Sequence, residues 1–170
     1  MNRSIFLRVV PWLALALSLP VLAHEPGARA ADILPTAPIP DAVSVPLDAA
    51  ALAALPREPV EAVAHGKALH CEGVTLTALL QASGAMPRET LRGSHLARRV
   101  ELRARDGYRV TFALADFDPE LGAVRAVVVD RCDGRPLPAD DGPLRLIVPA
   151  EKRPARWIRQ LVAVDVLSPR

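Results

Sequence analysis

A short segment near the C-terminus gathers basic side chains between two apolar runs: Lys152, Arg153, Arg156 and Arg159. Guanidinium groups bind phosphate and carboxylate groups through paired hydrogen bonds, so this segment is a candidate anion-binding loop. Trp157 lies among the basic residues, and its ring could either stack on a planar ligand or fill the core. A run of charges is more often a solvated turn, and this simpler interpretation stays open on the pattern alone.

Two cysteines, Cys71 and Cys132, are the next candidates for chemistry. In an exported chain a single disulfide between them is the simplest interpretation, although the sequence does not show that they come within bonding distance. Cys71 also follows His70 and lies near His65, which suggests a metal site. Neighbouring residues on a strand point to opposite faces, so we do not expect these side chains to converge on a metal.

The N-terminal residues predict export. Residues 1–23 combine Arg3 and Arg8 with an apolar stretch and small residues before His24, which is typical of a cleaved secretory signal peptide. Residues 24–42 are rich in proline and predict a flexible arm. No other stretch is long and apolar enough to span a membrane. We therefore expect an exported protein, periplasmic in a Gram-negative bacterium and secreted otherwise, without stable membrane insertion after cleavage.

The charge balance argues against nucleic-acid binding. The full chain carries 21 lysines and arginines against 19 acidic residues, and Arg3 and Arg8 account for the whole excess. Without the signal peptide the formal charge is zero, whereas a protein that follows a phosphate backbone needs a basic surplus. We therefore expect no nucleic acid among its partners.

The elements that must position these residues are short. A strand is expected at 42–47, followed by a helix capped by Asp48. Two further strands are expected on either side of a turn at 65–66. The next helix is expected to begin after Thr75 as its N-cap and to stop at Gly84, because glycine readily ends a helix.

The second half of the chain predicts strands almost throughout. Residues 98–114 alternate apolar and charged residues around a turn at 106–107, which indicates a hairpin. A buried strand then ends in a turn at 133–134, and 142–149 and 157–167 supply two more strands on either side of the basic segment. Many short strands, few short helices and no regular βαβ rhythm predict a single α+β domain built on a mixed or antiparallel sheet.

Four segments together resemble the oxidoreductase molybdopterin-binding domain of the sulfite oxidase superfamily: "EGVTLTALLQASGA", "DGYRVTFALADFDPE", "AVVVDRCDGRPLPADDGPLRLIVP" and "RPARWIRQLVAVDV". They follow the family's order of a helix, a hairpin, a strand that ends in a DG-PLP turn, and a basic loop before a tryptophan. The resemblance covers roughly Val43 to Leu167. It implies a domain over residues 43–168 with a β-rich molybdopterin-binding fold.

The resemblance also implies roles for individual residues. In sulfite oxidases basic residues of this loop help to hold the pterin phosphate, and alignment on Trp157 places Arg153 and Arg156 at those positions. Arg159 would extend the same anion-accepting rim. In a working molybdenum enzyme Cys71 would be the metal thiolate, yet the family's cysteine lies well upstream of this position. The loop also lacks the family's glycines, and the signal peptide lacks the twin arginine of relatives exported with their cofactor.

Three functions stay open. The leading hypothesis is a binding or accessory module of an exported redox system, whose arginine loop accepts an anion. Its expected partner is an anionic small molecule or a redox partner protein. The first alternative is a functional molybdopterin-dependent oxidoreductase, in which Cys71 binds the metal and the arginines bind the cofactor phosphate. The second alternative is a structural or interaction domain with a disulfide between Cys71 and Cys132 and a merely solvated basic turn.

Overall fold

The computed structural model describes residues 41–169 of the chain. The expected signal peptide, residues 1–23, lies outside this part, and so does the expected arm up to residue 40. The end of that arm differs from the expectation, because Ala42 already belongs to the first strand. Among the described residues, no helix has the length and apolar composition needed to span a bilayer.

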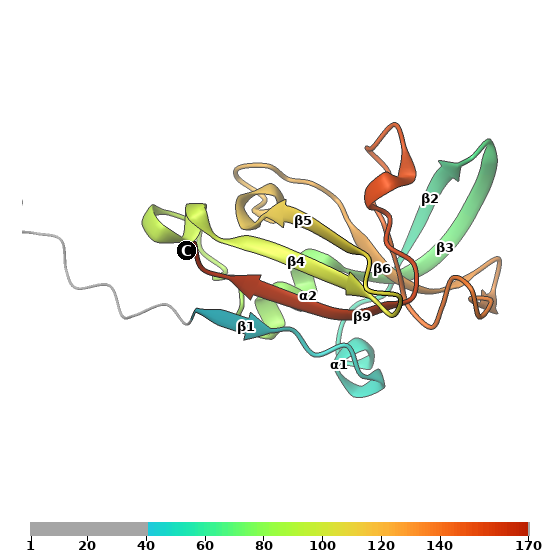
Figure 1. The fold of residues 1–170 in the computed structure, drawn as a ribbon, viewed down its shortest axis with the longest axis horizontal. Coiled ribbons are helices and arrows are strands. Elements are labelled where there is room, and N and C mark those ends of the chain that lie inside the picture. Colours follow the sequence, from blue (N-terminus) through green and yellow to red (C-terminus); the bar gives the residue numbers. More distant parts are fainter. Residues whose placement is uncertain (1–40, 170) are drawn as a thin grey trace, which may run out of the picture. The chain divides into compact units, whose positions relative to one another are not determined.

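The first of two antiparallel sheets joins strands from both ends of the described chain (Figure 1). Its order is β1-β9-β4-β5, and the strands are β1 (Ala42–Ser44), β9 (Leu161–Leu167), β4 (Arg99–Ala104) and β5 (Arg109–Ala113). Val100 and Leu102 of β4 are buried, and so are Val110 and Phe112 of the expected hairpin partner β5. The residues between them point outward, so the sheet has one face on the core and one in solvent.

The second sheet carries the candidate cysteines. Its order is β2-β3-β6-β7, and β8 pairs with the edge of β6 that faces away from β3. Its strands are β2 (Glu58–Ala64), β3 (Lys67–Thr75), β6 (Val127–Cys132), β7 (Arg135–Pro136) and β8 (Arg145–Ile147). Val127, Val128 and Val129 are all buried, so the first half of β6 lies inside the molecule on both faces. All strand pairs of both sheets are antiparallel.

The helices begin where the sequence predicts them. Before α1 (Ala49–Ala53), the Asp48 carboxylate accepts hydrogen bonds from the N–H groups of Ala50 and Ala51, both at 3.0 Å. Before α2 (Leu76–Ala82), the Thr75 hydroxyl accepts a bond from the N–H of Ala78 at 3.2 Å. Three short 3-10 segments complete the set: η1 (Gly93–Ala97), η2 (Leu114–Phe117) and η3 (Pro154–Arg156).

Both sheets and α2 contribute to one hydrophobic core. Phe117, Leu80, Leu102 and Leu146 are among its largest fully buried side chains, and they come from η2, α2, the first sheet and the second sheet respectively. The predicted α+β class with a few short helices is confirmed, and the sheets are antiparallel rather than mixed. The division of the strands between two sheets is new, because periodicity shows which residues are buried but not which strands pair.

The β2–β3 hairpin extends beyond the rest of the second sheet as a two-stranded ribbon (Figure 1). β2 pairs with β3 along its whole length, whereas β6 pairs with β3 only from Cys71 to Thr75. Residues 61–70, which we call the ribbon, therefore form strand pairs only with each other. At its base, a Cβ on Gly73 would lie 1.9 Å from the carbonyl oxygen of Val128, so only glycine allows β3 and β6 to approach this closely.

Candidate functional site

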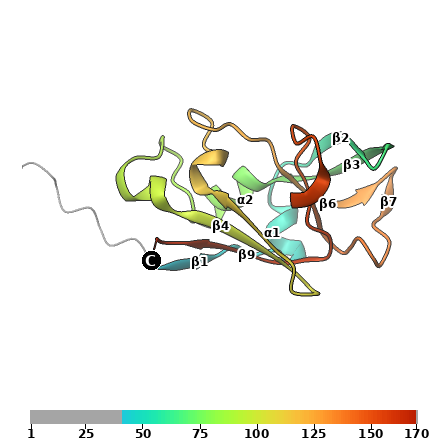
Figure 2. The same ribbon diagram turned by 45° about the horizontal axis from the view of Figure 1, so that its top comes forward.

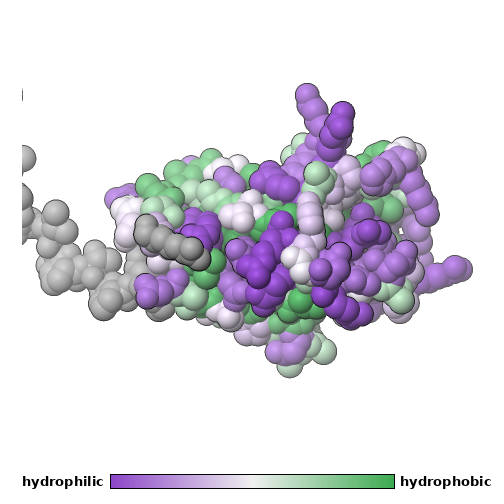
Figure 3. Space-filling view, in the orientation of Figure 1, coloured by the Kyte–Doolittle hydropathy of each residue, from purple (hydrophilic) through white to green (hydrophobic). Residues whose placement is uncertain are grey.

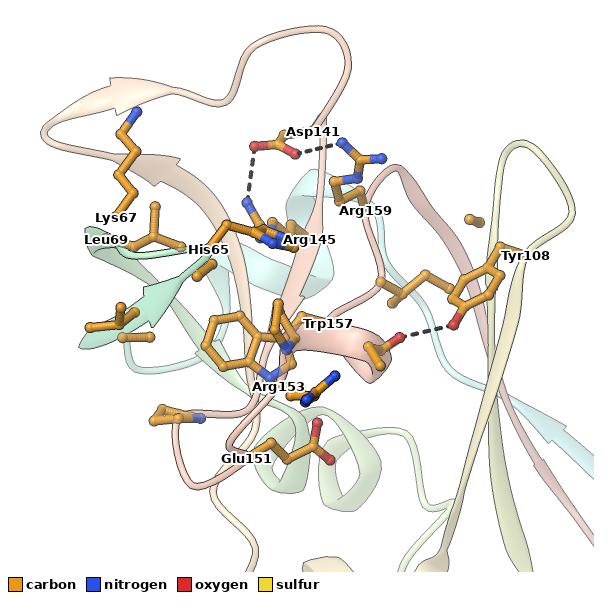
Figure 4. Close-up of a pocket in the computed structure, with 18 of the residues that line it drawn as sticks. His65, Lys67, Leu69, Tyr108, Asp141, Arg145, Glu151, Arg153, Trp157 and Arg159 are labelled. Carbon is orange, nitrogen blue, oxygen red and sulfur yellow. Dashed lines mark hydrogen bonds and ion pairs between the residues drawn. The ribbon is translucent and has the colours of Figure 1, made fainter.

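An open cleft of about 1500 Å³ lies beside the basic loop, residues 148–160 between β8 and β9. Three other segments line it: the ribbon, the β4–β5 turn and the loop that leads into β8 (Figure 4). We call it the basic-loop cleft. In Figures 1 and 2 the short coil of this loop stands at the same end of the molecule as β2 and β3. The cleft exceeds the roughly 300–1000 Å³ that is usual for small-molecule pockets.

The fold places the basic loop at this cleft because the loop joins the two sheets. β8 belongs to the second sheet and β9 to the first, so the chain must cross between them. Hydrogen bonds close the crossing at its ends: the N–H of Leu146 donates to the Ile158 carbonyl at 2.9 Å, and the N–H of Leu161 donates to the Leu144 carbonyl at 2.9 Å. Ile158 is buried, so it fixes the loop to the core while the residues before it stay outside.

The β4–β5 turn holds the loop from the opposite side. The Tyr108 hydroxyl donates a hydrogen bond to the carbonyl of Ala155 at 2.9 Å (Figure 4). Tyr108 is half exposed, so its ring forms part of the cleft wall. The hairpin that the sequence predicted at 98–114 thus contributes directly to the site, through a residue that the sequence pattern had assigned only to the strand.

A buried arginine forms the inner end of the cleft. Arg145 lies in β8, and its Nη1 is 3.0 Å from Oδ2 of Asp141. The other oxygen of Asp141 is 3.8 Å from Nη1 of Arg159, so this carboxylate serves two guanidinium groups (Figure 4). Sequence reasoning missed Arg145 and Asp141. The signal that could have found Arg145 was a charged residue inside the apolar run of 144–149.

Three cations of the cleft lining have no acidic partner among the described residues: Lys67, Lys152 and Arg153. Lys67 comes from the ribbon, and the other two come from the basic loop. Hydrophilic side chains project from the surface where that loop lies (Figure 3). Asp106 and Asp140 also line the cleft, and Asp106 accepts a hydrogen bond from the N–H of Tyr108 at 2.9 Å. The cations without an acidic partner therefore lie on the ribbon and on the basic loop, while Asp106 and Asp140 form no ion pair among the described residues.

The three arginines and the tryptophan that the sequence suggested as ligand-binding residues have different environments. Arg153, Arg159 and Trp157 line the cleft, whereas Arg156 does not. Arg156 forms an ion pair with Glu151, and its guanidinium lies 4.0 Å above the ring of Phe112. Arg156 is therefore placed to hold the loop on the first sheet rather than to meet a ligand.

Trp157 fills the floor of the cleft. Only 4% of the residue is exposed, so the ring packs in the core with one edge at the cleft. Its Nε1 is buried and has no hydrogen-bond partner among the described residues, and the same is true of Nε of Arg145. Of the two roles that the sequence left open for this ring, the structure shows core packing.

The two cysteines form a disulfide, as one of the three hypotheses expected. Cys71 of β3 and Cys132 of β6 are direct partners in the strand register, and their sulfurs are bonded. The chain's only cysteines are thus both engaged, and Cys71 has no thiolate to give to a metal. His70 points to the other side of the ribbon, where its Nδ1 is 3.7 Å from Oε1 of Glu61, and His65 lies at the ribbon turn.

The donors present therefore do not fit a molybdenum cofactor. Among the described residues, no cluster of three histidines, cysteines or acids is placed to hold a metal ion. Positive charge for a phosphate is present at Lys152 and Arg153, but the thiolate that the family resemblance implies is sealed in the disulfide. We derive no chemical step through this cofactor.

A network of four charged side chains anchors the base of the ribbon, on Arg57, Glu72, Asp130 and Arg131. Arg57 contacts both oxygens of Asp130, with Nη2 at 2.6 Å and Nη1 at 3.2 Å, and Nε of Arg131 is 3.2 Å from Oε1 of Glu72. Burial alone would raise the pKa of the Asp130 carboxyl, but the hydrogen bond and charge of Arg57 outweigh it and hold this pKa below its usual value. The network thus stabilises the base of the ribbon, which forms one wall of the cleft.

Compared with known proteins, the chain matches no protein-family model and no curated protein. The functional conclusion therefore depends on the chemistry of the cleft. Its walls offer charged N–H donors on two segments, a buried floor at Trp157 and a second wall held by Tyr108. Such a surface can bind and orient a group that carries negative charge.

Proposed function

We propose that the protein is an exported anion-binding module, in which the basic-loop cleft accepts a ligand that carries phosphate or carboxylate groups. One observation carries the proposal: Lys67, Lys152 and Arg153 line one cleft from two segments without acidic partners, while Asp141 neutralises the neighbouring Arg145. Export is supported by the signal-like residues 1–23 and by the disulfide, since disulfides persist mainly in oxidising compartments.

We further propose that the chain is a reduced relative of molybdopterin-binding domains and that it acts as an accessory module of a redox system. The basic loop that precedes Trp157 supports this relation, because it supplies the positive charge that such domains use for a phosphate. The disulfide at Cys71 removes the one thiolate that a molybdenum enzyme would need. For this reason a binding function is proposed and an oxidoreductase activity is not.

The test is isothermal titration calorimetry of the full chain with inorganic pyrophosphate at low ionic strength. We expect Arg153→Ala to weaken binding about tenfold, because a charge-assisted hydrogen bond to an anion typically contributes about 1.5 kcal/mol or more. Lys152→Ala is expected to act in the same direction but less strongly, since an ammonium group does not offer the paired donors of a guanidinium.

Arg103→Ala is the matched control. Arg103 lies on the outward-facing side of β4, has no ion pair among the described residues and does not line the cleft. It makes the same change in net charge, so we expect pyrophosphate affinity to stay within about twofold of the wild type. Equal losses for Arg103→Ala and Arg153→Ala would show a general charge effect, and absence of binding by the wild type would contradict the proposal outright.

A further inference from the structure

The strand that forms one wall of the cleft has a free edge. Within the part of the chain that the structure describes, β2 pairs with β3 on one side only, since it is the first strand in the order of the second sheet. Such an edge presents a row of backbone N–H and C=O groups that can pair with another strand. The part of β2 from Ala62 to Ala64 lines the basic-loop cleft, so this stretch of the edge borders the site described above.

The register shows which backbone groups point outward. Residues of an antiparallel pair alternate between hydrogen-bonded and non-bonded positions. The turn at 65–66 has positive φ at both residues, as in a tight two-residue hairpin turn, so Ala64 and Lys67 form a bonded pair. Counting back along β2, the N–H and C=O groups of Val63 and Glu61 point away from β3. No hydrogen bond to these groups occurs within residues 41–169.

The other end of the same edge is closed. Pro59 also points outward by this register and has no N–H to offer, which is how edge strands are often protected. Nη2 of Arg125 donates to the Pro59 carbonyl at 2.7 Å and is 3.1 Å from Oε2 of Glu58. The edge is therefore covered up to Pro59 and open from Glu61 to Val63, where the cleft begins. Val63 is 66% exposed, an unusual apolar residue for an unprotected edge.

The surroundings of this open stretch select the chemistry of a partner strand. The ribbon face toward the cleft is apolar at Ala62 and Leu69 and cationic at Lys67. Lys152 and Arg153 line the cleft from the basic loop. Figure 4 labels Arg153 beside Trp157. A strand added to β2 would place alternate side chains toward this positive region and the others toward solvent. The cleft also has more room than a small molecule needs, as an extended chain requires.

We propose that the basic-loop cleft binds an extended, acidic polypeptide segment that adds a strand to the free edge of β2 at Glu61 and Val63. This inference rests on the proposed function and names its partner class: the anion is a row of carboxylates on a protein rather than a free phosphate. Main-chain hydrogen bonds to Val63 and Glu61 align the segment, and Lys67, Lys152 and Arg153 select its acidic side chains.

The experiment uses a fluorescent peptide of alternating glutamate and valine, titrated with the full chain in fluorescence anisotropy. Val63→Pro removes the outward N–H at a position where proline does not disturb the pairing with β3. We expect this variant to bind the peptide at least about tenfold more weakly, because residue 63 can no longer donate to the partner strand and the proline ring occupies the edge that the strand would approach. Val63→Thr keeps the N–H and a β-branched side chain, and is expected to bind like the wild type.

A second comparison needs no variant of the protein. The same peptide, methylated on every peptide nitrogen, keeps all its charge but cannot donate to a neighbouring strand. Strand addition predicts that the wild type binds the methylated peptide at least about tenfold more weakly than the unmodified one. Should Val63→Pro fail to fold, which its thermal melt would reveal, this comparison decides the matter.

Pyrophosphate separates this inference from the function on which it rests. Strand addition predicts that Val63→Pro binds pyrophosphate as the wild type does, whereas Arg153→Ala loses affinity for both probes. If pyrophosphate binds but the peptide does not, or if methylation and Val63→Pro leave peptide affinity unchanged, strand addition is wrong and anion binding stands. If neither probe binds, both proposals are wrong.

Discussion

Arg156 and Glu151 determine how much positive charge the cleft presents. Their ion pair removes Glu151 from competition with an incoming anion, because this carboxylate lines the cleft while its partner lies outside the lining. Under the proposed function, Arg156 would therefore act on binding through Glu151 and not by contact with the ligand. Its position over the Phe112 ring, at 4.0 Å, also ties the loop to the first sheet.

We predict that Arg156→Ala weakens pyrophosphate binding, because it leaves the Glu151 carboxylate unpaired at the cleft. The variant should also lose about 1 kcal/mol of stability, through the lost ion pair and ring contact. Adding Glu151→Gln should restore the affinity but not the stability, which calorimetry and thermal melts would measure. An affinity that stays low in the double variant would show that Arg156 touches the anion itself.

Asp130 gives the ribbon base a dependence on pH. Its pKa is lower in the folded chain than in the unfolded one, so its ion pair with Arg57 contributes stability above the unfolded pKa of about 3.9 and loses it as the pH falls through the folded value. We predict that Asp130→Asn costs about 1 kcal/mol or less at pH 7, because both side chains are about a third exposed, and that this cost shrinks as the pH falls below about 3.9. Urea titrations of both proteins at pH 7 and near pH 3 would measure it, and a cost as large near pH 3 as at pH 7 would contradict the assignment.

At the level of elements, the ribbon is the part of the cleft that most needs support. An isolated two-stranded hairpin is marginal in water. Here the disulfide between Cys71 and Cys132 and the network around Arg57 both act where β3 leaves β6. These two anchors hold the wall that carries Lys67 and the free edge of β2.

We predict that replacing both cysteines, Cys71→Ser with Cys132→Ser, lowers the free energy of unfolding by about 2–4 kcal/mol. The same change should speed hydrogen exchange in the ribbon, residues 61–70, more than in β4, and should weaken pyrophosphate binding through the displaced Lys67. Exchange measured by mass spectrometry would compare the two regions. An equal increase in both would mean that the disulfide stabilises the core as a whole and not the ribbon.

Gly73 is a second requirement of the same junction. Because a Cβ at this position would meet the Val128 carbonyl at 1.9 Å, we predict that Gly73→Ala forces β3 and β6 apart and costs at least about 2 kcal/mol. Gly84→Ala is the comparison, since a Cβ there has open space and only the positive φ of 72° opposes it. Thermal melts of the two variants would measure the difference, and a milder effect at Gly73 would contradict the close approach.

Local signals predicted the elements well, and tertiary pairing accounts for what they left out. The caps at Asp48 and Thr75 and the turns at 65–66 and 106–107 depend on neighbouring residues only, so the sequence contains them. The ion pair of Arg145 with Asp141 joins residues only four positions apart, and the charged residue within the apolar run of 144–149 was a signal for it. The contact of Tyr108 with the Ala155 carbonyl joins segments 47 positions apart and follows from no pattern along the chain.

For the site, the sequence identified the basic loop but not which of its arginines line the cleft. Arg153 and Arg156 look equivalent in a run of charges, yet one lines the cleft and the other pairs with Glu151. The sequence could not associate Lys67 with the loop. The two line one cleft only because the chain crosses from β8 to β9 and because the ribbon projects beyond the second sheet. The residue types predicted anion binding, and the fold determined which of these residues line the same cleft.

At the scale of the whole molecule, positive charge is local and not general. Residues 24–170 carry 19 basic and 19 acidic residues, so long-range attraction to a polyanion is weak. We predict that the chain lacking residues 1–23 binds duplex DNA more weakly than the alternating glutamate–valine peptide, and that added salt lowers affinity for the peptide because the cleft cations are exposed. Anisotropy with the two labelled probes at two salt concentrations would show this, and tighter binding of DNA would contradict it.

Amide chemical shifts would locate an anion in the basic-loop cleft residue by residue. In an isotope-labelled sample titrated with pyrophosphate, we predict that the largest shifts fall on Lys67, Lys152 and Arg153, with small changes along β1 and the outer face of β4. Shifts centred instead on Arg57 and Arg131, or spread evenly over exposed arginines, would place the anion elsewhere and show that the cleft is not its binding site.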